Sequence, residues 1–79
     1  MYRTEFFTRD ALDHLPRALD VIRKMGFSLL DLHVKAVRGG ARVHLVFADA
    51  GAQSAAVFAE RVAALRGIES FSQAELAAA

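Results

Sequence analysis

The chain has 79 residues, a net charge of +1, no cysteine and a hydrophobic content of 54%. So short a chain forms one small domain that is only marginally stable alone, which predicts association with other chains. The hydrophobic content excludes a disordered chain, the missing cysteines exclude a disulfide framework, and the near balance of acidic and basic residues argues against a nucleic-acid-binding surface.

A strand and an amphipathic helix are predicted first. Residues 2–8 mix aromatic residues with threonine, as strands do. Beyond them, apolar residues recur at spacings of three and four, which predicts one buried helix face, at Leu15, Ala18, Leu19, Ile22 and Met25. Pro16 favours Asp13 as the N-cap, because a proline in the first turn loses no helical hydrogen bond. His14 would then be an exposed first-turn residue, and Gly26 would end the helix.

Residues 28–37 and 41–48 are predicted to form a hairpin of two strands. Alternation divides the first strand into two sides. Leu30, Leu32, Val34 and Ala36 lie on one side, and Leu29, Asp31, His33, Lys35 and Val37 lie on the other. A two-residue loop at Gly39 and Gly40 then sets the register. It pairs Val34 with Leu45, Ala36 with Val43, and Leu32 with Phe47. Every inner pair is apolar, which predicts that this side lies beneath the helices.

A second helix and a last strand follow a predicted loop at residues 49–51. The helix is predicted from Ala52 to Arg66, with Gly67 as its stop and an apolar stripe at Ala55, Phe58, Val62 and Leu65. Residues 68–73 then form a short strand.

This order of elements predicts an α+β, ferredoxin-like fold, in which two helices cover one face of a four-stranded antiparallel sheet. We expect residues 1–76 to form a single domain and residues 77–79 to fray. No apolar run approaches the roughly 20 residues of a membrane span, and the first residues carry no signal-peptide core. We therefore expect a cytoplasmic protein without membrane contact.

The sheet face away from the helices is the predicted interface. Its candidate contacts combine apolar, aromatic and histidine side chains, at Phe7, His33, Val37, His44 and Val46. Burial of the apolar members, or pairing of an unguarded edge strand, would give a homodimer or a higher oligomer. An ordinary solvated sheet face is the alternative.

The two histidines of that face raise the question of a metal site. In the predicted register His33 lies opposite Val46 and His44 lies opposite Lys35, so the histidines are diagonal neighbours. Two diagonal histidines make at most half of a zinc site, and no metal site is predicted.

No nucleophile motif or nucleotide-binding motif occurs, so we predict no catalytic residue and no cofactor bound by this chain. Asp10 and Asp13 stand just before the first helix, where capping and the helix dipole explain both. The glycine pair at Gly39 and Gly40 forms a turn rather than a phosphate cradle, because no helix follows it.

The segment Leu15–Phe27, with a leucine, a basic helix rich in valine and isoleucine, and a final Gly-Phe, resembles the first helix and turn of an ACT domain. The likeness is greatest to the short, single-domain small subunit of acetohydroxyacid (acetolactate) synthase. In length and element order the resemblance extends over nearly the whole chain.

The resemblance implies a non-catalytic regulatory subunit that binds the acetolactate synthase large subunit in branched-chain amino-acid synthesis. Thiamine diphosphate, FAD and Mg would then belong to that catalytic partner. In effector-binding relatives an amino acid lies against the loop entering the first helix and near the turn that ends it. The resemblance therefore implies an effector site at Asp10, Ala11, Leu12, Asp13, Ser28, Leu29 and Leu30.

Two positions depart from the effector-binding pattern. Asp13 stands where those relatives have a glycine, and Ser28 stands where they have an asparagine. A carboxylate at Asp13 would repel the carboxylate of an amino acid. We therefore expect a structural or activating subunit, with a stand-alone amino-acid sensor as the alternative.

Overall fold

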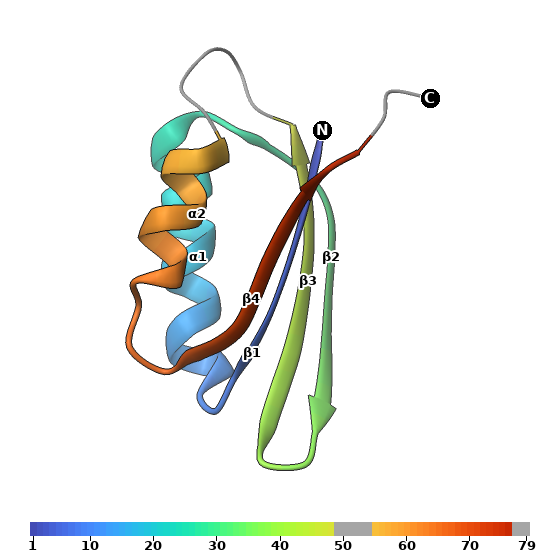
Figure 1. Ribbon diagram of the computed structural model, residues 1–79, viewed down its shortest axis with the longest axis vertical. Coiled ribbons are helices and arrows are strands. Elements are labelled where there is room, and N and C mark those ends of the chain that lie inside the picture. Colours follow the sequence, from blue (N-terminus) through green and yellow to red (C-terminus); the bar gives the residue numbers. More distant parts are fainter. Residues whose placement is uncertain (49–54, 77–79) are drawn as a thin grey trace.

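The computed structural model describes residues 1–48 and 55–76. The predicted loop at residues 49–51 and the predicted frayed tail at residues 77–79 lie outside the described residues. In chain order the elements are β1 (Tyr2–Thr8), α1 (Ala11–Met25), β2 (Ser28–Val37), β3 (Gly40–Ala48), α2 (Ala55–Ala63) and β4 (Ile68–Glu75). The four strands form one antiparallel sheet in the order β2-β3-β1-β4, and both helices lie on the same face of it (Figure 1). The predicted ferredoxin-like α+β fold is confirmed.

Helix α1 begins three residues earlier than predicted. Asp10 is the N-cap, and its carboxylate accepts a hydrogen bond from the Asp13 backbone N–H at 3.3 Å, so the prediction of Asp13 as the cap is wrong. Pro16 therefore lies inside the helix, where it has no N–H to donate to the Leu12 carbonyl. Leu12 is 91% exposed, so this turn faces solvent and water can bond to the freed carbonyl. Gly26 ends the helix at a φ of 75°, as predicted.

The β2–β3 hairpin turns at Arg38 and Gly39, one residue before the predicted loop. Val37 pairs with Gly40, and Gly39 has a φ of 84°, as the second loop position of a type II turn requires. The observed register pairs Leu32 with Leu45, Val34 with Val43, and Ala36 with Ala41, and differs by two residues from the predicted one. Side chains of a strand alternate with a period of two, so this shift keeps each of these residues on its predicted face.

A bulge at the start of β2 changes the placement of two leucines. Leu29 pairs with Phe47 and Asp31 pairs with Val46, which leaves Leu30 as the extra residue. Leu29 thus lies on the helix side of the sheet, although simple alternation predicted it on the other side. From Asp31 onward the pairing of β2 is regular.

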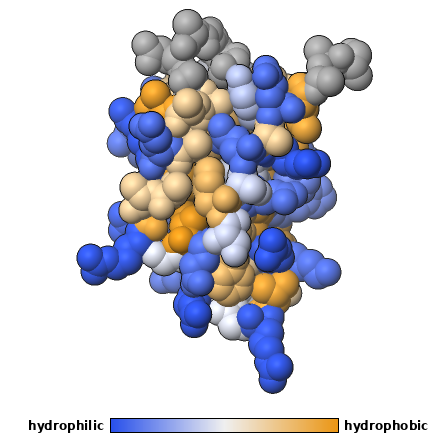
Figure 2. Space-filling model, in the orientation of Figure 1, coloured by the Kyte–Doolittle hydropathy of each residue, from blue (hydrophilic) through white to orange (hydrophobic). Residues whose placement is uncertain are grey.

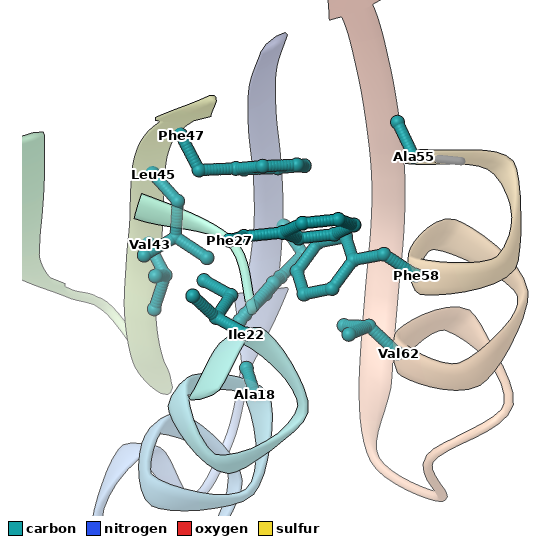
Figure 3. Close-up of a cluster of buried hydrophobic side chains, with 10 residues drawn as sticks. Ala18, Ile22, Phe27, Val43, Leu45, Phe47, Ala55, Phe58 and Val62 are labelled. Carbon is teal, nitrogen blue, oxygen red and sulfur yellow. The ribbon is translucent and has the colours of Figure 1, made fainter. Parts of the chain in front are cut away.

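The hydrophobic core lies between the two helices and the centre of the sheet. Its buried members are Phe6, Ala18, Ile22, Phe27, Val43, Leu45, Phe47, Ala55, Phe58 and Val62. Phe47 is central, because Phe27 stacks on it with ring centroids 5.1 Å apart and Phe58 packs against it at 4.8 Å (Figure 3). None of these buried residues belongs to β2. The helices therefore cover the centre of the sheet and leave this edge strand open.

The predicted faces of both helices are confirmed, whereas the end of α2 is not. Ala18 and Ile22 of α1, and Phe58 and Val62 of α2, are buried. Helix α2 ends three residues before the predicted Arg66, and its predicted start lies outside the described residues.

The replacement of Gly40 by alanine tests the observed turn. A Cβ at Gly40 would lie 2.2 Å from the Thr8 carbonyl oxygen, so backbone atoms of β1 must move to make room. We expect Gly40→Ala to lower the free energy of unfolding by about 1–3 kcal/mol in urea denaturation. The matched control is Gly39→Asn, which meets nothing within 4 Å at its Cβ and keeps a residue that tolerates positive φ. An equal loss of stability in both variants would contradict this hairpin geometry.

Candidate functional site

The helix side of β2 is an uncovered apolar row at the edge of the sheet. Leu29 and Val34 are each 43% exposed on this side and Leu32 is half-buried, while the unpaired bulge residue Leu30 is 50% exposed. The sequence correctly placed Leu32 and Val34 on the helix side. Leu32 packs against the core, but the prediction that the helices also cover Val34 is wrong. An edge strand also presents backbone N–H and C=O groups without a strand partner. Both features favour the addition of another strand along β2.

The opposite edge of the sheet, β4, lacks such a row. A register shift between Glu5 and Phe7 interrupts its pairing with β1, and Ser70 has a positive φ of 52°. Gln73 points inward, where its side chain accepts a hydrogen bond from Thr4 and donates one to the Ala55 carbonyl. Irregular, polar edges of this kind resist pairing with another chain. The two edges thus differ, and β2 is the open one.

Charged residues alternate with the apolar row along β2. Asp31, His33 and Lys35 point to the face away from the helices, opposite Val46, His44 and Arg42 of β3. Lys35 therefore faces a like charge within its own chain. Asp31 contacts the His33 ring, with 3.3 Å between its Oδ2 and the Nε2 of His33. Beyond Arg42, the residue in line with Lys35 on β1 is the apolar Phe7.

The predicted interface residues all lie on this outer face, as the sequence indicated. Phe7, Val37 and Val46 are half-buried there, and His44 is half-buried while His33 is exposed. His33 and His44 are direct neighbours, so their predicted diagonal placement is wrong, as are the predicted partners Val46 and Lys35. The correction follows from the turn at Arg38 and Gly39.

The predicted effector residues fall into two groups at opposite ends of α1. Residues 10–13 form the cap and first turn of the helix, whereas residues 28–30 begin β2 after the helix has ended. A helix of 15 residues separates its ends by roughly 22 Å. A single chain therefore does not bring the two groups to one ligand.

A small cavity of about 270 Å³ opens beside the first turn of α1. Its lining residues are Asp13, His14, Arg17, Leu65 and Arg66. His14 is only 7% exposed and its Nδ1 is hydrogen-bonded to the buried Thr8 hydroxyl, so its prediction as an exposed residue is wrong. Gly67 packs directly on this ring, because a Cβ there would lie 2.5 Å from the His14 Cε1. The buried His14 side chain of α1 thus contacts both β1, through Thr8, and the turn before β4, through Gly67.

The cavity holds no arrangement suited to nucleophilic catalysis among the described residues. Asp13 pairs with Arg17 at 3.2 Å, and Thr8 is fully buried beneath His14. A nucleophile must be accessible to its substrate, and Thr8 is not.

Several charged side chains of the described residues form ion pairs with one another, including Arg9 with Glu69 and Arg17 with Asp13. On the face shown in Figure 2, hydrophilic side chains lie on both sides of a group of apolar side chains. On the solvent side of α1, a hydrogen bond from Lys24, and to a smaller extent one from Arg23, lowers the pKa of the Asp20 carboxyl.

Neither helix of the described part is long and apolar enough to cross a bilayer.

Sequence reasoning missed Asp31, Leu32, Val34 and Lys35 as site residues. Their signal was present in the segment Asp-Leu-His-Val-Lys, which has opposite charges equally spaced about His33. What the sequence lacked was the sheet order, which places this segment at an edge.

Comparison with known protein families found no matching family model, and comparison with curated proteins found no matching relative.

Proposed function

We propose that this chain is a non-catalytic subunit that acts by association, and that it pairs with a second copy of itself along β2. The observation that supports the proposal is the open β2 edge, whose apolar row is left uncovered by the helices. In the wider proposal, the resemblance to ACT domains makes the paired chains the small subunit of an acetolactate synthase-like enzyme. Thiamine diphosphate, FAD and Mg would be bound by the large subunit.

A second copy of the chain carries charges on its own β2 that are complementary to those of this edge. When two β2 strands pair antiparallel about His33, Asp31 of each copy lies opposite Lys35 of the other. Lys35, which faces Arg42 within its own chain, thereby gains an acidic neighbour. On the helix side, Leu32 of each copy lies opposite Val34 of the other and extends the apolar surface.

Other registers lose this complementarity. A slip by one residue places charged side chains opposite the apolar row, and a slip by two residues places His33 opposite Asp31 or Lys35 and separates the oppositely charged pair. Opposed side-chain pairs contribute only about 0.2–1 kcal/mol each. The charges therefore select the register, while backbone hydrogen bonds and apolar burial supply the affinity.

The same pairing supports the alternative of an amino-acid sensor. The start of α1 lies at the hairpin end of the sheet, because Gly40 adjoins Thr8 and Arg9. Antiparallel pairing about His33 brings residues 28–30 of one copy toward the hairpin end of the other. The two groups of predicted effector residues, which are separated within one chain, would then meet between copies. Asp13 in this region still disfavours an amino-acid carboxylate.

A charge reversal tests the pairing. Lys35→Asp places two acidic side chains opposite each other at both ends of the paired segment, and we expect the dimer Kd to rise by about tenfold or more. The double variant Asp31→Lys with Lys35→Asp restores opposite charges and should recover most of the affinity. Sedimentation equilibrium measures the dimer Kd of the unaltered chain, of the single variant and of the double variant. A single variant that dimerises like the unaltered chain would overturn this register.

Co-purification tests the wider proposal. The untagged chain should elute together with an acetolactate synthase large subunit from the same source and raise its activity. Calorimetric titration of the chain alone with valine should show no binding heat, because Asp13 repels the ligand carboxylate. Binding of valine without any large-subunit association would instead support the sensor.

A further inference from the structure

His33 places a titratable side chain beside the open edge of the sheet. It points to the outer face, where its side chain is 70% exposed, and both helices lie on the other face (Figure 1). Its neighbour on β3 is His44, with 6.0 Å between the ring centroids. Histidine is the side chain whose charge ordinarily changes between about pH 5 and pH 8. The surroundings of His33 therefore determine whether association along β2 responds to pH.

Within one chain, the charged group in contact with the His33 ring is a carboxylate. The Oδ2 of Asp31 lies 3.3 Å from the Nε2 of His33, and the other side of the ring is open to water. A protonated His33 thus has an acidic contact of its own in the single chain. The other charged or titratable side chains on this face near His33 are Lys35 of β2, Arg42 and His44 of β3 and, one strand further away, Arg3 and Glu5 of β1.

Pairing of β2 about His33 places a second imidazole against the open side of the ring. His33 of one copy lies directly opposite His33 of the other, and opposed residues of an antiparallel pair have Cβ atoms about 4.5–5.5 Å apart. The second copy also brings its own Asp31 and Lys35 to the diagonal positions, where their opposite charges offset each other. The uncompensated group that each His33 gains on pairing is therefore the imidazole of the other copy.

Protonation of His33 opposes this arrangement. Two imidazolium rings at that distance repel each other, and pairing removes water that would screen them. In the pair, Asp31 lies opposite Lys35 of the other copy, so its carboxylate is shared between that lysine and the His33 ring. A single chain therefore binds a proton at His33 more readily than a paired chain does.

We propose that His33 makes association along β2 depend on pH, so that paired chains separate on acidification. The inference rests on the proposed pairing and adds its regulation. Because the single chain binds more protons at His33 than the paired chain, a fall in pH favours the single chain by linkage. Carboxylates and lysine ordinarily titrate near pH 4 and pH 10, roughly, so the Asp31–Lys35 pairs that select the register keep their charges while His33 titrates.

Sedimentation equilibrium of the tag-free chain at about pH 7.5 and about pH 5.5 tests this inference. We expect the dimer Kd to rise by about tenfold or more at the lower pH. In His33→Gln, which keeps a polar side chain that does not titrate, the Kd should change by less than about twofold. The matched control is His44→Gln, which removes the neighbouring imidazole on the same face, leaves the His33 pair intact and should keep most of the rise.

The same measurements separate this inference from the proposed pairing. A dimer whose Kd is equal at the two pH values overturns the pH response and leaves the pairing intact. A chain that is monomeric at both pH values overturns both. A rise in Kd that persists in His33→Gln, whether it comes from acid unfolding or from another titrating group, overturns the assignment to His33.

Discussion

The two-residue turn at Arg38 and Gly39 is the constraint on which the candidate site depends. It pairs Val37 with Gly40 and so determines the hairpin pairs as far as Asp31 and Val46, where the bulge begins. Gly40 in turn must be a glycine because β1 approaches it closely at the Thr8 carbonyl. A turn one residue later would keep the same faces but would separate the two histidines. The opposition of His33 and His44 thus follows from a contact made by a different strand.

The second constraint is the placement of the helices over the centre of the sheet. Phe27 and Phe58 pack against Phe47 of β3, so the core lies over β3 and β1 and away from β2. The apolar residues of β2 then lie beside the core rather than within it. The two helices of this small domain do not cover all four strands, and in the proposed pairing a second chain would add apolar surface at the open edge. The proposed self-association would in this sense follow from the small size of the domain.

Periodicity predicted the element order, the buried helix faces and the faces of both hairpin strands, because these depend on local spacing. Three features of the structure could not be predicted from periodicity, each for a physical reason. Asp10 and Asp13 are both good caps, and the exposure of Leu12, which makes Pro16 tolerable inside the helix, is a tertiary property. Gly39 and Gly40 both permit a turn, and only the approach of β1 distinguishes them. Alternation assigns Val34 to a side of the sheet but not to a place beneath a helix.

The most direct test of the central claim, that two copies meet at His33, is a single engineered thiol. The chain has no cysteine, so His33→Cys introduces the sole thiol of each copy. In the proposed register these thiols face each other across the two-fold axis, where opposed Cβ atoms lie about 4.5–5.5 Å apart, close to disulfide geometry. In Lys35→Cys the same atoms would be roughly 13 Å apart. Mild oxidation should therefore link the first variant into a covalent dimer far faster than the second; equal rates, or faster linkage of the second, would contradict the account.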